Sequence, residues 1–137
     1  MNQNIPISNE LMASSPTPTE LPFPAEVEID YDYLTRLAME LSEEDFAKSL
    51  DRSAHRAIAL VCAIGEAYAS HRLSESLPLV QELDHVASEL GLTRINECCI
   101  AFEDCLRSQN LVAFAAILGR AERALDCGLS HIKVPDR

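Results

Sequence analysis

Three side chains that could take part in chemistry share one side of the segment from Val80 to Leu92. At about 100° per residue, a helix over this segment directs Gln81, His85 and Ser88 away from its apolar residues and toward solvent. A neutral imidazole such as that of His85 is a competent nucleophile, whereas the Gln81 amide is not, because its nitrogen lone pair is delocalised. Asp84 adds a negative charge to this surface, and phosphoryl chemistry depends on positive charge.

The segment resembles the central helix of histidine-containing phosphotransfer domains, whose loose pattern is Ala-His-x-Leu-Lys-Gly followed by small residues and Leu-Gly. The residues in register with this pattern are Leu83, Ala87, Leu90 and Gly91. Gln81 takes the place of the phosphorylated histidine, Asp84 that of the lysine and His85 that of the glycine. The resemblance covers roughly residues 30 to 128. It implies an all-α fold, an up-down four-helix bundle with a short leading helix.

The departures from the pattern indicate a degenerate member of this family that carries no phosphate itself. We expect a binding module of a bacterial two-component or phosphorelay pathway that docks a response-regulator receiver domain or a histidine kinase. The expected contact surface consists of Gln81, Asp84, His85 and Ser88. The resemblance implies neither enzymatic activity nor a metal or cofactor.

Two alternatives remain open from the sequence. The first is an active phosphorelay intermediate that uses His85 as phosphoacceptor, or His55, because Ala54-His55 precedes Ile64-Gly65 at the family's spacing. The second is a helical adaptor or dimerisation protein outside signalling, since a fold alone does not determine a function.

Helical periodicity runs from Ile29 onward without any alternating, strand-like stretch. Ser42 and Asp45 resemble a variant capping box, Pro78 is tolerated in a first turn, and Gly91 suits the left-handed conformation after a helix. The predicted helices are a short one carrying Tyr33 to Leu41, a long one from Ser42 to about His71, a third from Ser74 or Ser76 to Gly91, a fourth from Thr93 and a fifth from Asn110 to near Gly128.

Composition divides the 137 residues into three parts. Residues 1–28 contain five of the seven prolines and no periodicity, which predicts a disordered, acidic Pro/Ser-rich tail. Residues 29–130 form the predicted bundle, and residues 131–137 a C-terminal tail.

Charge and cysteine content limit the compartments and the kinds of partner that suit this protein. A formal net charge of −11 with scattered bases argues against a nucleic-acid partner. The most apolar stretch is far shorter than the ~20 residues of a membrane span, and the N-terminus lacks the features of a secretory signal. Five cysteines without a CxxC pair or zinc-ligand spacing are typical of buried apolar side chains in a reducing compartment. We therefore expect a cytoplasmic protein that meets no membrane.

Overall fold

The computed structural model describes residues 29–132 and shows an all-helical chain over that range. The predicted acidic tail and residues 133–137 lie outside the described residues. The elements are α3 (Tyr31–Glu40), α4 (Glu43–Ala69), the short 3-10 helix η2 (Leu73–Glu75), α5 (Ser76–Leu90), α6 (Thr93–Ser108) and α7 (Leu111–Ile132). The predicted helical fold class is confirmed for this part of the chain.

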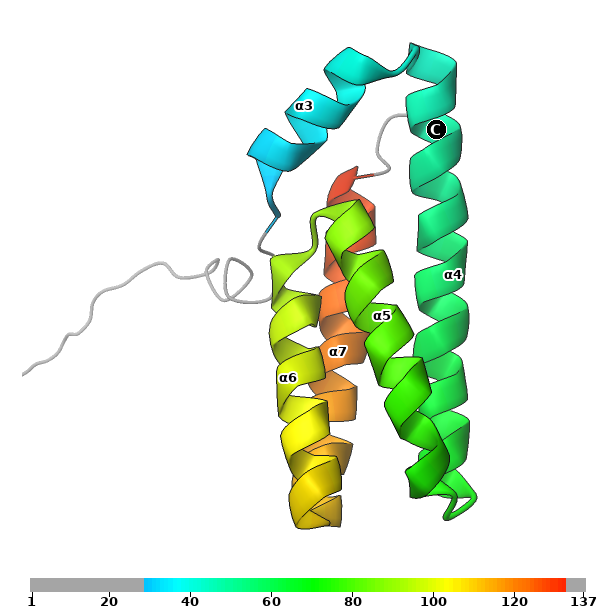
Figure 1. Cartoon of the computed structure of the whole chain (residues 1–137), viewed down its shortest axis with the longest axis vertical. Coiled ribbons are helices and arrows are strands. Elements are labelled where there is room, and N and C mark those ends of the chain that lie inside the picture. The colour runs from blue at the N-terminus through cyan, green and yellow to red at the C-terminus, as the bar shows by residue number, and fades with distance from the viewer. Residues whose placement is uncertain (1–28, 133–137) are drawn as a thin grey trace, which may run out of the picture.

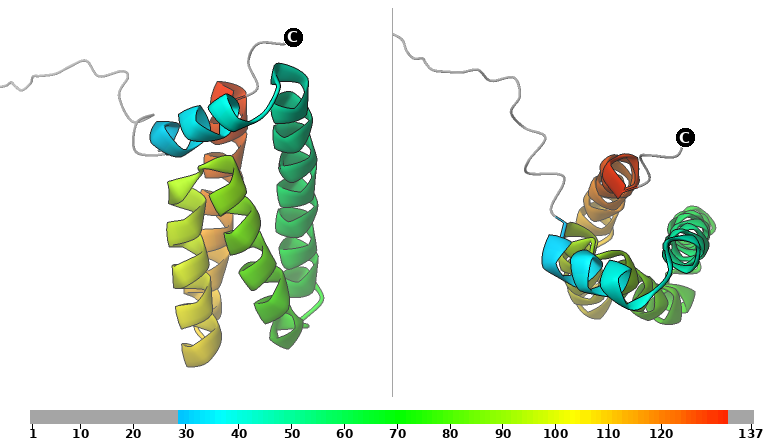
Figure 2. Two further views of the ribbon diagram at one scale, coloured as in Figure 1. Left: turned by 45° about the horizontal axis from the view of Figure 1, so that its top comes forward. Right: turned by 90° about the horizontal axis from the view of Figure 1, so that it is seen from above.

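The four long helices lie side by side, and each runs antiparallel to the helix before it (Figure 1). Helix α4 contacts α5 and α7, while α6 contacts α5 and α7, so the four helices surround a common core. The short helix α3 crosses over one end of this group (Figure 2). It is attached there by a hydrogen bond from the Asp30 N–H to the Gly91 carbonyl at 2.7 Å and by a bridge between Ile29 and Leu92.

Aromatic and branched side chains from all four long helices fill the core. Phe102 of α6 and Phe114 of α7 are fully buried, with ring centroids 4.8 Å apart, and Tyr68 of α4 stacks on Phe114 at 5.7 Å. Helix α5 contributes Leu83, which is also fully buried. Because these side chains occupy one face of each helix, the opposite faces remain in solvent.

Side chains cap the first turns of two helices at the positions predicted from the sequence, Ser42 and Asn110. Ser42 Oγ accepts a hydrogen bond from the Asp45 N–H at 3.0 Å at the start of α4. Asn110 Oδ1 accepts one from the Ala113 N–H at 3.1 Å at the start of α7. Each oxygen satisfies a backbone donor that has no partner within its helix. Gly91 ends α5 with φ of 72°, as expected for the residue after a helix.

The predicted cap of the third helix is wrong. Neither Ser74 nor Ser76 caps α5: the turn before it is the 3-10 helix, and no side chain bonds its first N–H groups. Ser76 lies inside the first turn, fully buried, and its hydroxyl has no hydrogen-bond partner among the described residues. Pro78 does occupy the first turn, where its missing N–H costs nothing.

The predicted end of the last helix is also wrong, because α7 continues past Gly128 to Ile132. Gly128 is a packing residue. A Cβ atom there would lie 2.7 Å from Cδ2 of Leu92, which is buried against it. The glycine therefore permits close approach of the chain after α5 and does not end the helix.

Candidate functional site

Helix α5 presents the predicted contact residues because its opposite side is packed into the core. Val80, Leu83 and Leu90 are fully buried. Gln81 and His85 project from the other side and are exposed. Ser88 is exposed as well, whereas Asp84 is half-buried. We call these last four residues the α5 ridge: Gln81, Asp84, His85 and Ser88.

One edge of the α5 ridge is fixed to α6. Asn96 Nδ2 lies 2.8 Å from Asp84 Oδ1 and 2.9 Å from the Asp84 carbonyl oxygen. The same nitrogen lies 3.2 Å from Ser88 Oγ, and Ser88 Oγ donates to the Asp84 carbonyl at 3.1 Å. The Asp84 carboxylate is thus held at the seam between the two helices, where its negative charge stays beside Gln81.

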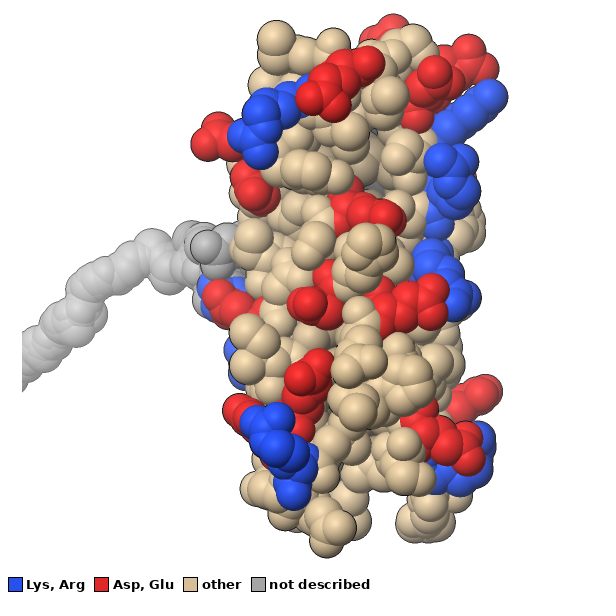
Figure 3. All heavy atoms as spheres, viewed as in Figure 1, with Lys and Arg blue, Asp and Glu red and all other residues tan. Residues whose placement is uncertain are grey.

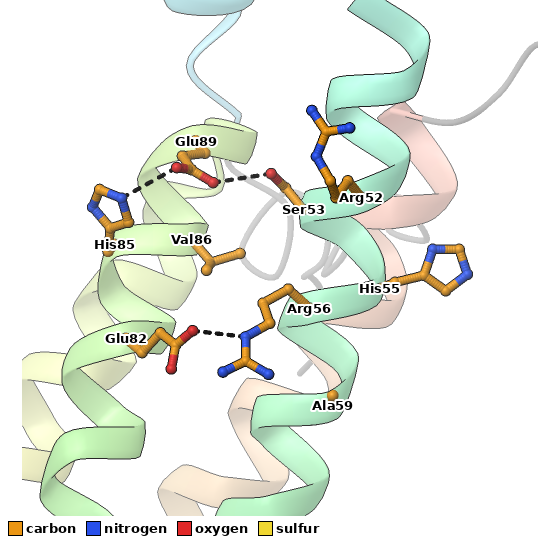
Figure 4. Close-up of a pocket in the computed structure, with 9 residues that line it drawn as sticks. All are labelled: Arg52, Ser53, His55, Arg56, Ala59, Glu82, His85, Val86 and Glu89. Carbon is orange, nitrogen blue, oxygen red and sulfur yellow. Dashed lines mark hydrogen bonds and ion pairs between the residues drawn. The ribbon is translucent and has the colours of Figure 1, made fainter.

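The other edge of the ridge borders an open groove of about 540 Å³ between α4 and α5. Figure 4 shows Glu82 and Glu89 directed from α5 toward α4, whereas the His85 ring lies on the side of α5 away from α4, at the border of the groove. Arg56 of α4 reaches across and donates from Nε to Glu82 Oε2 at 2.6 Å. This ion pair joins the two helices beneath the ridge.

Glu89 lies between a hydroxyl and an imidazole. Ser53 Oγ donates to Glu89 Oε1 at 3.0 Å, and His85 Nε2 lies 3.1 Å from Glu89 Oε2. A serine nucleophile needs the imidazole next to its hydroxyl, with the carboxylate behind the imidazole. Here the carboxylate is in the middle, so His85 cannot take the Ser53 proton. This arrangement positions side chains and does not activate a nucleophile.

The structure does not bring His55 to the ridge. Its ring points away from α5 in Figure 4, and its Nδ1 lies 2.8 Å from the Asp51 carbonyl oxygen one turn earlier on α4. The second histidine that the sequence offered as a phosphoacceptor therefore lies at the border of the groove on α4, with its ring turned away from α5.

Helix α4 carries a short row of bases that was not predicted from the sequence. Lys48, Arg52 and Arg56 follow one another at intervals of four residues, and Figure 3 shows Lys and Arg side chains gathered along this edge of the molecule. Lys48 pairs with Glu44 at 3.2 Å, whereas Arg52 has no ion-pair partner within residues 29–132. The four-residue interval was the signal that could have identified the row.

The ion pair across the groove shifts the titration of both partners. The hydrogen bond from Arg56 lowers the pKa of the Glu82 carboxyl, and the same bond raises the pKa of Arg56. Glu82 is therefore ionised throughout the neutral range. The groove accordingly carries two arginines and two carboxylates, and its only base without a partner in the described range is Arg52.

Comparisons with protein-family models, curated proteins and solved structures found no match. Within residues 29–132, no helix is both long and apolar enough to cross a bilayer. The same range contains no cluster of three or more His, Cys, Asp or Glu side chains arranged to hold a metal ion.

Proposed function

We propose that this chain is a phosphotransfer-like four-helix binding module that docks a receiver domain or a histidine kinase through the α5 ridge without carrying phosphate. The observation that carries the proposal is the exposed Gln81 amide, because it stands at the position of the family's histidine on a helix whose back is rigidly packed. An amide nitrogen cannot form the phosphoramidate through which that family's reaction passes.

The charges around Gln81 support a role in binding over one in phosphoryl transfer. Asp84 is fixed beside it by Asn96, and Glu82 and Glu89 face the groove on the other side. Electrostatic stabilisation of a transferring phosphoryl group requires cations aimed at its oxygens. The nearby cations are on α4, where Arg56 is already paired with Glu82.

The proposed partner surface is tested by direct binding. The intact protein is titrated by calorimetry into a panel of receiver domains and histidine kinases, alongside Gln81→Ala and His85→Ala variants. We expect at least one partner whose affinity falls about tenfold or more in these variants, the loss produced by ~1.4 kcal/mol of binding free energy. Glu122→Ala, an exposed change on α7, is the matched control and is expected to bind normally. Binding that is insensitive to both ridge variants would contradict the proposal.

His85 supports the second candidate function, an active phosphorelay intermediate, because its side chain is 75% exposed on the same ridge. With Nε2 directed at Glu89, the lone pair that could accept phosphate is on Nδ1. Incubation with a phosphorylated receiver followed by mass spectrometry at neutral pH separates the two candidates. Phosphate on His85 would replace the binding proposal, and an unmodified chain agrees with it.

A further inference from the structure

Helix α3 is attached much less firmly than the four long helices. Leu34 is its one buried residue, and no residue from Thr35 to Ser53 is buried. Helix α5, by contrast, buries six residues along its length. Figure 2 shows α3 lying across the end of the four-helix group and not alongside any long helix. We call residues 29–41, which comprise α3 and the residues on either side of it, the strap.

Two hydrogen bonds join the strap to the C-terminal end of α5. The Tyr33 hydroxyl donates to the Glu89 carbonyl oxygen at 3.0 Å. The Asp30 N–H donates to the Gly91 carbonyl oxygen at 2.7 Å. The last carbonyl groups of a helix have no donor within that helix. The strap therefore supplies donors that α5 cannot supply itself, and it caps the C-terminal end of α5.

An apolar contact reinforces this cap. The strap lies so close to Gly91 that a Cβ atom there would be 3.4 Å from Leu34 Cγ and 3.3 Å from the Asp30 carbonyl oxygen. Leu34 thus packs directly on the end of α5. Isolated helices shorter than about 12–15 residues are marginal in water, and α3 has 10 residues. The order of the strap therefore depends on its contacts with the end of α5.

The link between α3 and α4 provides a hinge. Leu41 and Ser42 are both extended, with ψ of 159° and 161°, so the helical hydrogen-bond pattern is interrupted there. Ser42 Oγ caps α4 by accepting from the Asp45 N–H. Helix α4 therefore keeps its own N-terminal cap whatever the position of the strap.

We propose that the strap opens at Leu41 and Ser42 while the four long helices stay folded, and that its opening loosens the last turn of α5. Opening removes the donors of the Glu89 and Gly91 carbonyl groups, so this turn loses its cap. The strap is then a conformational control on the end of α5.

The last turn of α5 also holds the side chain that orients His85 of the α5 ridge. The Glu89 carboxylate accepts from Ser53 Oγ at 3.0 Å and lies 3.1 Å from His85 Nε2. A closed strap keeps this carboxylate in place by ordering the turn that carries it. An open strap lets the turn fray, and His85 then loses its fixed neighbour.

A partner bound to the ordered ridge would stabilise the closed strap, because a ligand favours the state to which it binds more tightly. This consequence rests on the proposed function. The opening itself is a property of the free chain and is measured without any partner, so its failure and the failure of the proposed function are distinguishable.

The test is amide hydrogen exchange of the full chain, followed by NMR at neutral pH with reductant and at several urea concentrations below the unfolding transition. An opening confined to the strap exposes little surface, so its free energy depends only weakly on urea. We expect the amides of α3 and those of Gly91 and Leu92 to share one such shallow urea dependence. Amides near the buried Phe102 should show the steep dependence of global unfolding.

Two tyrosines of α3 provide matched variants. Tyr33→Phe removes the hydroxyl that bonds Glu89 and should raise the opening equilibrium constant by roughly threefold to tenfold, the effect of losing one hydrogen bond. Tyr31→Phe makes the same change at a 61% exposed residue and should leave that constant unchanged. A urea dependence of the α3 amides as steep as that of the core would overturn the proposal. So would amides of Gly91 and Leu92 that stay protected while those of α3 exchange, or equal effects of the two tyrosine variants.

Discussion

Under the proposed function, position 84 carries a carboxylate beside Gln81, which takes the place of the family's phosphorylated histidine, and Asn96 holds that carboxylate there. The amide of Asn96 lies 2.8 Å from Asp84 Oδ1, so the charge is oriented and cannot swing away from Gln81. In the proposed phosphotransfer-like module, two separate features of α5 oppose phosphoryl transfer: the non-nucleophilic amide at position 81 and the fixed negative charge at position 84.

Restoring the nucleophile alone should not restore the reaction. We expect Gln81→His to accept phosphate from a phosphorylated receiver at least about tenfold more slowly than Gln81→His combined with Asp84→Lys, a difference of ~1.4 kcal/mol in the barrier. Phosphate on the helix is measured by mass spectrometry at neutral pH. Asp84→Lys alone is the control and should remain unmodified at position 81. Equal rates for the single and double variants would show that charge at position 84 has no part in the barrier.

The cysteines differ in reactivity because they differ in burial. Cys62 is exposed, whereas Cys98, Cys99 and Cys105 are buried. Desolvation by burial, with a smaller contribution from Asp84, raises the pKa of the Cys99 thiol far above its ordinary value of 9.0. A thiol that stays neutral is a poor nucleophile, so alkylation in the folded state should begin at Cys62.

The raised pKa of Cys99 predicts a loss of stability in alkali. Above about pH 9 the Cys99 thiol loses its proton more readily in the unfolded chain than in the folded chain. The contribution of Cys99 to the free energy of unfolding is therefore fully present below that pH and falls above it. Burial also raises the pKa of Tyr33 from 10.0, which adds to the loss at higher pH. Urea denaturation at pH 8 and pH 10 measures the change. Cys99→Ala should lose less stability over this interval than the native chain, and an identical loss would contradict the assignment.

Side chains cap the first turns of α4 and α7, whereas no side chain caps α5. The helices α4 and α7 start at residues whose side chains accept from the first turn, Ser42 and Asn110. Helix α5 starts from a 3-10 turn and buries the hydroxyl of Ser76 instead. A capping oxygen satisfies a backbone donor, whereas a buried hydroxyl without a partner has lost its hydrogen bonds to water.

These two situations predict opposite effects of the same substitution. Asn110→Ala should lower the free energy of unfolding by about 1 kcal/mol, because the Ala113 N–H loses its acceptor. Ser76→Ala should raise it or leave it unchanged, because the substitution removes a buried polar group without a partner in the described chain. Denaturant unfolding of both variants checks the pair. A loss of about 1 kcal/mol in Ser76→Ala would show that its hydroxyl is bonded in solution.

The packing of the whole molecule depends on how closely the chain segments approach one another. Gly128 allows Leu92 to pack onto α7, and Leu92 follows the turn that receives the chain entering α3. Tyr33 of α3 donates to the Glu89 carbonyl at 3.0 Å at the same end. Gly128 of α7 therefore affects how α3 meets the end of α5 at this end of the molecule.

Two glycines of α7 provide a matched test of this packing. Gly128→Ala should lower the free energy of unfolding by about 1–3 kcal/mol, because the new Cβ forces the buried Leu92 to move. Gly119→Ala should raise it by about 0.5–1 kcal/mol, because its nearest neighbour is the Arg123 Nη1 at 3.5 Å and alanine favours a helix interior. Thermal melts of both variants measure the difference. The same sign of change at the two positions would contradict the packing argument.

The spacing of apolar residues was sufficient to predict the helices and the outward direction of Gln81, His85 and Ser88, whereas the helix-end signals failed at the start of α5 and at the end of α7. Both kinds of signal act within a few residues of the chain, so they do not depend on the rest of the fold. Gly128 was predicted to lie near the end of the last helix but lies inside α7, where it packs against Leu92. A glycine in the sequence does not by itself distinguish a helix end from a close packing contact.

Only the tertiary structure decided which residues meet between helices. It brought Asn96 to Asp84, Arg56 to Glu82 and Ser53 to Glu89. These contacts depend on the rotation and axial offset of each helix relative to its neighbour, and both quantities are set by how the buried side chains of all four long helices pack together. Sliding a helix along its axis leaves the same face of that helix buried. The pattern of a single helix therefore contains no information about its axial offset.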